Sequence, residues 1–475
     1  MIDISRRLFL AGAAASGARF LGAAPCGEAN LRLGVLSDIH IFDEKQVPVF
    51  ERALEFFRDR KADGVIIAGD MADRGLVDQL ELVANAWFKV FPANRRPDGQ
   101  PVEKLFVYGN HDVLGHGYGD TPKTLAEKYP DEKEQAAHRI ATDRKAVWER
   151  LFKEPWAGVY AKQVKGYTFI GSHWGYEKKL AAFMKDNATR LGLKGPKPFF
   201  YAQHPHPKDT IYGPWAWGHD NGASTRAFSK TPNAIVFTGH SHYPLTDESG
   251  IWQDTFTSIG TASLRYIGHR YNRENSGYGG GPVEQMPRMK DGHSKHGLLV
   301  SVFDDHIDVA RRDFQNDESL GADWVLPLPL CKEKPYAIPP RAVKARENLP
   351  AFAADAGSLI KAEDVDGKDR RGTPTPQTVV TFPTALAGGR AFDYEVQAEL
   401  NYYDVTRVFC TKRVFAPEYF RTESKLAKEG QIVFARVAEV PEHVDVRFVV
   451  TPLDCYGNRG KSIYSKKFKL GEAKK

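Results

Sequence analysis

The sequence has few cysteines. The four among 475 residues are Cys26, Cys331, Cys410 and Cys455, and no spacing between them suggests a zinc site. In an oxidising compartment one disulfide is conceivable, with Cys410 and Cys455 as the favoured pair because both lie in the C-terminal region; whether they pair is left open. With 42% hydrophobic and 27% charged residues, the chain is expected to be a soluble globular protein with a large core.

The chain also lacks a concentrated block of Lys or Arg. It has 66 Lys and Arg against 60 Asp and Glu, a formal net charge of +6. This mild excess tolerates an anionic substrate, but it falls far short of the basic footprint of a nucleic-acid-binding protein. Nucleic-acid binding is therefore not predicted.

No long uninterrupted apolar run occurs near the N-terminus, because Arg19 breaks the Ala/Gly-rich stretch, which makes it a poor transmembrane anchor. The segment "SRRLFL" (Ser5 to Leu10) resembles the twin-arginine export signal; the alternative is an ordinary basic n-region. We therefore predict a signal peptide over residues 1–29 and a periplasmic or secreted protein. Cleavage after Ala24 and after Ala29 are both left open.

From residue 31 onward, apolar segments of two kinds alternate along the chain. Short runs such as "LRLGVLSD", "GVIIAGD" and "KLFVYGN" read as strands, and longer segments with helical periodicity lie between them. This order predicts a layered α/β domain, which we place at residues 30–326. Residues 269–295 have no periodicity and are expected to form a long loop.

The C-terminal part of the chain has a different pattern. Residues 327–376 carry many prolines and are predicted to be a connector, and residues 377–475 alternate in β fashion. The segment "VRFVVTPLDCYGNRGKS" resembles the last hairpin of a fibronectin type III or immunoglobulin-like module. A small all-β sandwich is therefore expected after the α/β domain.

Five short polar segments follow apolar runs in the first domain. Because strand C-terminal ends converge on one edge of an open α/β sheet, these segments can meet in space. They supply oxygen and nitrogen donors, which suit Mn, Fe, Zn or Ni. The segments are "SDIH" (Asp38, His40), "GD" (Asp70), "GNHD" (Asn110, His111, Asp112), "QHPHP" (His204, His206) and "GHSH" (His240, His242).

In this order the five segments resemble the calcineurin-like metallophosphoesterase family, across roughly residues 31–314. The resemblance implies a β-sandwich core flanked by helices (αββα) and two metal ions, with Mn, Fe or Zn as candidates. It implies further that Asp70 bridges the two ions. Asp38, His40 and His242 would bind the first ion, and Asn110, His204 and His240 the second.

The resemblance also implies roles for the rest of "GNHD". His111 would face the substrate, and Asp112 would hold its ring from behind and raise its pKa. His206 remains an alternative to His204, and Asp73 is expected to cap a helix or support a ligand. Purple acid phosphatases, a branch of the same superfamily, have a metal-bound tyrosine at the position of Asp73, so a purple iron centre is not expected.

These features predict an exported dinuclear-metal phosphoesterase that hydrolyses small-molecule phosphate esters by metal-activated hydroxide. The forms "GDMAD" and "GNHD" resemble the branch that contains phosphodiesterases, which favours diesters slightly. A phosphomonoesterase or a nucleotide pyrophosphatase is the alternative on the same centre. A non-catalytic exported binding protein is a third, and the C-terminal sandwich is a candidate for envelope binding or self-association.

Overall fold

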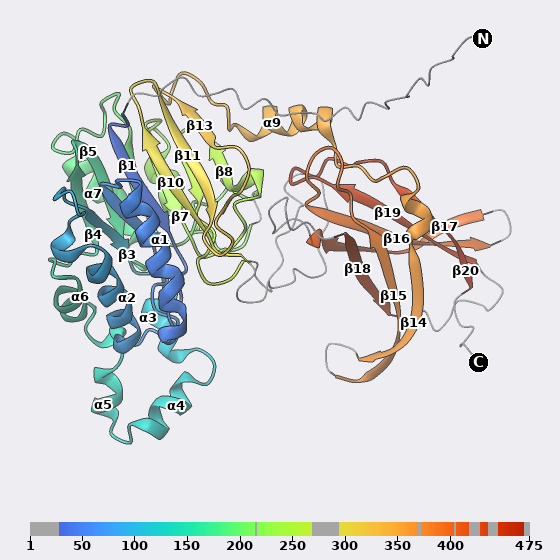
Figure 1. Ribbon diagram of the computed structural model, residues 1–475, viewed down its shortest axis with the longest axis horizontal. Helices are drawn as coiled ribbons and strands as arrows, with labels where there is room; N and C mark the ends of the chain where they lie inside the picture. The colour runs from blue at the N-terminus through green and yellow to red at the C-terminus, as the bar shows by residue number, and fades with distance from the viewer. Residues whose placement is uncertain are drawn as a thin grey trace, which may run out of the picture.

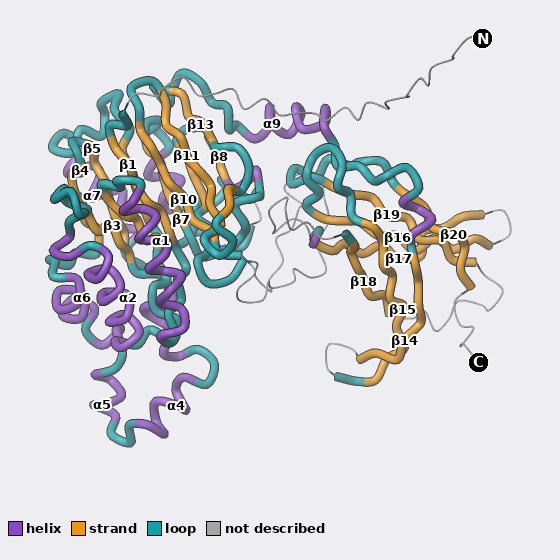
Figure 2. Tube along the Cα trace, in the orientation of Figure 1, coloured by secondary structure: helices purple, strands orange, loops and turns teal. Residues whose placement is uncertain are grey.

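The computed structural model describes residues 28–213, 216–267, 294–368, 372–402, 405–417, 428–435 and 445–469. The predicted signal peptide and the predicted loop at 269–295 fall almost entirely outside these ranges. Figures 1 and 2 show the strands gathered in two blocks, the first with helices around it and the second formed by the C-terminal region.

The first sheet has the strand order β12-β11-β10-β1-β2-β3, with β13 paired to β11. β1, β2 and β3 are parallel, with Leu33 opposite Gly64, and β10 joins β1 antiparallel. Its strands are β1 (Leu31–Leu36), β2 (Gly64–Ala68), β3 (Glu103–Val107), β10 (His296–Val302), β11 (His306–Asp313), β12 (Glu318–Ser319) and β13 (Trp324–Pro327).

The second sheet has the order β4-β5-β6-β7-β9-β8, and its central strands β5, β6, β7 and β9 are parallel. Its strands are β4 (Val159–Val164), β5 (Tyr167–Ser172), β6 (Phe199–Ala202), β7 (Ala234–Thr238), β8 (Ile251–Gln253) and β9 (Thr257–Gly260). The inner faces of both sheets belong to one hydrophobic cluster, in which Leu33 and Ile66 of the first sheet join Phe200 of the second.

Helices cover the outer faces of both sheets. Phe50, Leu54 and Phe57 lie at helical spacing on α1 and bury one face of it against the outer face of the first sheet, where Val65 and Ile67 point. β2 is therefore buried on both faces, which explains its uninterrupted apolar sequence. The helices are α1 (Val47–Asp59), α2 (Val77–Val90) and α6 (Arg144–Phe152) on the first sheet, and α7 (Leu180–Asn187) and α8 (Ala223–Phe228) on the second.

The resulting arrangement of helices, sheet, sheet and helices confirms the predicted αββα fold class. Three short helices follow β3, and two of them, α4 and α5, project from one end of the domain (Figure 1). These helices are α3 (Asn110–Leu114), α4 (Thr121–Lys128) and α5 (Glu132–Ala137). Among the described helices, none combines the length and the apolar character needed to cross a membrane.

The C-terminal region forms two antiparallel sheets, with orders β14-β15-β18 and β17-β16-β19-β20, which confirms the predicted all-β class of this region. The strands are β14 (Lys361–Lys368), β15 (Pro374–Pro383), β16 (Asp393–Tyr402), β17 (Val405–Phe415), β18 (Glu429–Ala435), β19 (Asp445–Leu453) and β20 (Ile463–Lys469). β14 and the helix α9 (Ile338–Lys344) lie inside the range predicted as a connector, so the sheets begin earlier than the sequence indicated.

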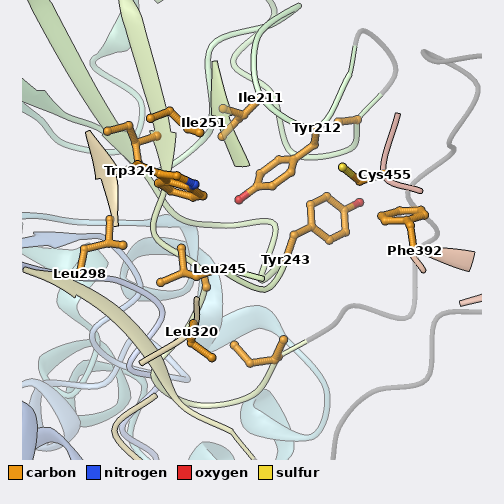
Figure 3. Packing of buried hydrophobic residues seen from close by; sticks show 14 of the residues in the cluster. Ile211, Tyr212, Tyr243, Leu245, Ile251, Leu298, Leu320, Trp324, Phe392 and Cys455 are labelled. Atoms are coloured by element: carbon orange, nitrogen blue, oxygen red, sulfur yellow. The ribbon is translucent and has the colours of Figure 1, made fainter. Parts of the chain in front are cut away.

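The C-terminal sheets pack against the first domain. Phe392 and Cys455 belong to the same buried cluster as Tyr243 of the first domain, and Figure 3 shows the three side chains facing one another. The Tyr456 hydroxyl donates to the carbonyl oxygen of Glu248 at 3.4 Å. Cys331, Cys410 and Cys455 take part in no disulfide among the described residues, so Cys410 and Cys455 are not paired there.

Candidate metal centre

The C-terminal ends of five strands place their polar residues at one edge of the two sheets. Asp38 and His40 follow β1, Asp70 follows β2, and Asn110 begins α3 directly after β3. From the second sheet, His204 follows β6, and His240 and His242 follow β7. The structure thus brings together all seven residues that the sequence singled out as metal ligands.

Five of these seven residues have a left-handed backbone. The φ angles are 50° at Asp38, 46° at His40, 52° at Asp70, 70° at His240 and 55° at His242. Residues with a Cβ adopt this region rarely and at a cost, and such outliers cluster at functional sites. The strained backbone turns each side chain back toward the common edge.

Two glycines allow the polar segments to approach one another closely. A Cβ atom on Gly109 would lie 2.2 Å from Asp70 Oδ1, and one on Gly239 would lie 2.2 Å from Asp38 Oδ2. Any side chain at either position would therefore displace a carboxylate of the site. This contact explains the glycine that begins "GNHD" and the glycine that begins "GHSH".

The first group of donors consists of Asp38, His40 and His242. The Nε2 atom of His242 lies 2.9 Å from Asp38 Oδ1 and 3.2 Å from the Nε2 atom of His40. All three side chains are buried. This group is the one the sequence predicted for a first metal.

The second group consists of Asp70, His204 and His240. His204 Nε2 lies 3.0 Å from Asp70 Oδ2, and His40 Nε2 of the first group lies 3.7 Å from the same oxygen. Asp70 therefore stands between the two groups, as a bridging carboxylate must. Asn110 adds a buried Oδ1 atom without a hydrogen-bond partner, while its Nδ2 donates to the Tyr118 hydroxyl at 3.3 Å.

Three of the histidines are held by their other ring nitrogen. Nδ1 of His204 lies 2.7 Å from the carbonyl oxygen of Ala68, and Nδ1 of His242 lies 2.9 Å from that of Tyr266. Nδ1 of His40 lies 3.1 Å from Asp73 Oδ1. Because these oxygens accept, each Nδ1 carries a proton. Each Nε2 then points inward as the atom available to bind a metal ion, which is the usual arrangement of metal-bound histidine.

Burial and mutual attraction shift the pKa values of these groups in opposite directions. Burial alone would raise the pKa of Asp38, but His242 and His204 hold it well below its usual range. Burial would lower the pKa of His204, but Asp70 and Asp38 raise it to about 9. The two carboxylates are thus kept ionised by nearby positive charge, which a proton or a metal ion can supply.

The donor set fits a pair of metal ions. Two carboxylates and four imidazoles converge in a buried volume, and the buried Oδ1 atom of the neighbouring Asn110 has no hydrogen-bond partner. Buried polar atoms are normally satisfied, so an unsatisfied acceptor beside clustered carboxylates and imidazoles indicates a cation site. Imidazole and carboxylate ligands suit Zn, Mn and Fe.

His111 lies beside the two groups rather than within them. Its backbone N–H donates to Asp70 Oδ1 at 2.8 Å, and its Nδ1 lies 2.7 Å from the carbonyl oxygen of Asp73. The side chain is 24% exposed and packs edge-on to His40, with ring centroids 4.5 Å apart. Burial lowers the pKa of His111, with Asp70 opposing it, so the expectation of a raised pKa is wrong.

Asp112 does not hold the ring of His111, contrary to the sequence-based expectation. Its Oδ1 accepts the N–H of Ala72 at 2.7 Å and its Oδ2 accepts the N–H of Gly109 at 2.8 Å. The short helix α3 turns the Asp112 side chain back toward the loop after β2, so the carbonyl of Asp73 takes the place beside His111. Burial and the nearby charge of Asp70 together raise the pKa of Asp112 to about 7, although these amide hydrogen bonds oppose the rise.

Four aromatic side chains that no sequence pattern had indicated surround the centre. Tyr266 stacks on His242 with centroids 4.3 Å apart, and Trp217 stacks on His240 at 4.6 Å. Trp174 lies 5.7 Å from the ring of His240, and Tyr118 lies 4.9 Å from that of His111. They come from different loops, so no local spacing in the sequence indicates them.

Comparison with known proteins bears on the first domain. Residues 31–244 match the family model described as calcineurin-like phosphoesterase. No curated protein matches the chain significantly.

Solved structures that match part of this chain include two phosphatases and a membrane-complex anchor. A dimetal phosphatase from Danio rerio is 12% identical, with 63% of this chain and 100% of that chain covered and a TM-score of 0.36. The purple acid phosphatase PPD1 from yellow lupin is 12% identical, with 65% and 56% covered and a TM-score of 0.38. GAP50, the anchor in the inner membrane complex of Plasmodium, is 12% identical, with 93% of that chain covered, 66% of this one, and a TM-score of 0.36.

Proposed function

Because residues 31–244 match the calcineurin-like phosphoesterase family and the chain is a metal-dependent phosphoric ester hydrolase, we propose an exported enzyme with a slight preference for phosphodiesters. In this proposal Asp38, His40 and His242 would hold one ion, Asn110, His204 and His240 would hold the other, and the Asp70 carboxylate would be shared by both. When bound, the two ions neutralise phosphoryl oxygens and lower the pKa of a water molecule.

The observation that carries the dinuclear assignment is the orientation of the histidines. His40, His204 and His242 each have Nδ1 on an oxygen acceptor, and each directs Nε2 toward a carboxylate of the centre. Once its proton is displaced, each of these rings can present Nε2 to a metal ion. Fixed rings also lower the reorganisation needed when substrate binds.

His111 is proposed to serve the substrate rather than a metal. The Asp73 carbonyl holds its Nδ1, which leaves Nε2 as the atom available to a bound molecule. Because burial lowers its pKa, a protonated His111 is a stronger acid than free imidazole and gives up its proton readily to a leaving alkoxide. The ring's edge-on contact with His40 keeps it next to the metal ligands.

The preference for diesters rests on the forms "GDMAD" and "GNHD" and needs a direct test. The purified protein would be loaded with Mn, Zn, Fe or Co, its metal content measured, and turnover of bis(p-nitrophenyl) phosphate compared with that of p-nitrophenyl phosphate. We expect a higher kcat/KM for the diester. A higher value for the monoester, or for a nucleotide pyrophosphate, would favour the alternative activities. No turnover of any substrate with two metals bound would favour a non-catalytic binding protein.

Export by the twin-arginine route and a binding role for the C-terminal sandwich are also proposed. Replacing Arg6 and Arg7 together by Lys should block export, and unchanged export would contradict the route. The division of the described C-terminal strands into a three-stranded and a four-stranded antiparallel sheet supports a fibronectin- or immunoglobulin-like module. Replacing the exposed Val405, Val408 and Phe409 of β17 by Ser should weaken envelope association or self-association while turnover is retained, if the module binds a partner.

A further inference from the structure

A cavity lies at the edge of the second sheet opposite to the metal centre. It has a volume of about 780 Å³ and is bounded by α7, α8, the turns that precede β6 and β7, and residues 329–331. β6 and β7 are parallel, and the metal-centre residues His204 and His240 follow their C-terminal ends. The five residues of β7 separate the two places by roughly 16 Å of strand.

The charge around the cavity has one sign. Lys185, Lys194, Arg226 and Lys230 line it, and no Asp or Glu occurs among the described residues that do so. Within the described ranges, these four cations take part in no ion pair. Elsewhere in the domain, cations such as Lys89 and Arg150 are paired with carboxylates. Four unneutralised cations around one hollow attract an anion.

The wall of the cavity is largely apolar. Met184, Leu193 and Leu330 are buried and line it together with three alanines and three prolines. A volume between 300 and about 1,000 Å³, an apolar wall and a few polar groups are the usual features of a small-molecule site. An inorganic anion would leave this wall in contact with water.

The turn that closes one side of the cavity is held in place by the protein itself. Asn233 donates from Nδ2 to the carbonyl oxygens of Leu193, Gly195 and Lys197, at 3.2, 2.9 and 3.1 Å. Asn233 is itself buried, as is Leu330 on the other side. The cavity is therefore largely formed before any ligand binds, which reduces the entropic cost of binding.

From these features we propose that the cavity is a second binding site, separate from the metal centre, for a soluble anionic amphiphile with a carboxylate or phosphate head and an aliphatic chain. The head group meets the lysines and Arg226 at the rim, and the chain lies along Met184, Leu193 and Leu330. Because the site is at the opposite edge of the sheet, its occupation does not require the metal ions.

The exposed thiol of Cys331 lines the cavity and reports on its occupation. Alkylation of Cys331 in the full chain would be followed by peptide mass spectrometry at increasing concentrations of dodecanoate or dodecyl phosphate, below their micelle concentrations. We expect saturable protection that slows alkylation about fivefold or more. The Asp70→Asn variant, altered at the metal centre, should be protected to the same extent.

A charge-matched pair of variants identifies the role of the cations. Lys185→Gln/Lys194→Gln/Lys230→Gln should need about tenfold more amphiphile for the same protection. Lys133→Gln/Lys145→Gln/Lys178→Gln removes the same charge from exposed positions outside the cavity and should behave as the unchanged protein. The proposal would be overturned if both triple variants lost protection of Cys331 equally, or if the first variant lost none.

Three further probes distinguish the kinds of ligand. Inorganic phosphate and dodecyl maltoside should each protect Cys331 far less than dodecanoate. Equal protection by phosphate would mean a simple anion site. Equal protection by the maltoside would mean non-specific hydrophobic binding. Protection by vesicles of phosphatidylglycerol in the absence of protection by the free amphiphiles would mean a membrane contact. Each of these outcomes contradicts a site for a soluble anionic amphiphile.

Discussion

The imidazoles of His40 and His242 face each other through their Nε2 atoms at 3.2 Å, although the Nδ1 atom of each ring lies on an oxygen acceptor. Two neutral rings in these tautomers would direct two lone pairs at each other. The pair is stable with a proton or a cation between the nitrogens. Burial lowers the pKa of His40, but hydrogen bonds to Asp38 and Asp73 raise it well above its usual value, so in the absence of metal the proton is present.

Metal binding should therefore release protons. The pKa of His204 is raised to about 9, so at pH 7 the metal-free centre holds this proton as well. A metal must displace it, and we expect metal affinity to rise with pH up to about 9, by roughly tenfold per pH unit for each proton released. Calorimetric titration with Mn²⁺ at pH 7, in two buffers of different ionisation enthalpy, measures the number released. An affinity that does not change between pH 6 and pH 9 would contradict this account.

The close approach of Gly239 to Asp38 can be tested without removing any ligand. A methyl group in Gly239→Ala would collide with Asp38 Oδ2 and shift this carboxylate. We expect about tenfold weaker metal binding or more, with the fold retained. Gly117→Ala is the matched control, because a Cβ at Gly117 has open space within 4 Å. Metal content by mass spectrometry and circular dichroism would be compared, and full metal content in Gly239→Ala would refute the steric explanation.

The sequence predicted the fold class and grouped the metal-centre residues because both depend on repeated local patterns. Apolar strands followed by Asp, His or Asn are visible one segment at a time, and parallel topology then brings the strand ends to one edge. The partners of the ring nitrogens do not follow such a pattern. Tyr266 holds His242 from 24 positions away, and its carbonyl carries no signature in the sequence.

Two predictions from the sequence were wrong for physical reasons: the start of the C-terminal sheets and the contact between Asp112 and His111. The boundary of the C-terminal sheets was placed too late because β14 is largely exposed, and its sequence "KAEDVDGK" lacks the alternation that marks a half-buried strand. The contact between Asp112 and His111 was expected because carboxylates in metal sites often accept a hydrogen bond from the ring of a nearby histidine. In the structure, the single turn of α3 directs Asp112 to the amides of Ala72 and Gly109 instead.

His111 is predicted to act on the substrate without holding a metal. In His111→Ala the backbone N–H that donates to Asp70 Oδ1 remains, so the bridging carboxylate keeps this hydrogen bond. We expect kcat to fall by about 10²–10⁴-fold, the range typical of a general acid, while the two metals stay bound. Steady-state kinetics and metal analysis on the same preparation test both parts. Loss of metal in this variant would mean that the role was assigned wrongly.

Asp112 is predicted to stabilise the loop after β2 rather than the ring of His111. In Asp112→Asn the side chain keeps a single acceptor oxygen, so either Ala72 N–H or Gly109 N–H loses its partner. We expect the free energy of unfolding to fall by about 1–3 kcal/mol, the cost of a buried unsatisfied group. Turnover should fall less than in His111→Ala. A loss of turnover equal to that of His111→Ala, with unchanged stability in urea, would restore the original expectation.

His173 is predicted to make the fold sensitive to acid. It is fully buried and accepts the Tyr108 N–H on Nδ1 at 3.0 Å, and burial, with a smaller effect of Arg144, lowers its pKa to about 3. In the unfolded chain its pKa is about 6.5, so between these values the unfolded state binds a proton that the folded state does not. Stability from this group is therefore complete above pH 6.5 and is lost as the pH falls, to an extent on the order of 4 kcal/mol near pH 3.

The variant His173→Gln isolates this contribution, because glutamine does not titrate and its amide oxygen can still accept the Tyr108 N–H. Urea unfolding of the metal-free protein at pH 7, 6 and 5 would be compared for the two chains. The histidine protein should lose about 1.4 kcal/mol more per pH unit below 6 than the variant, since the titrations of all other groups are common to both. Parallel curves would show that His173 accepts a proton in the folded state, against its burial among Trp148, Trp156 and Tyr160.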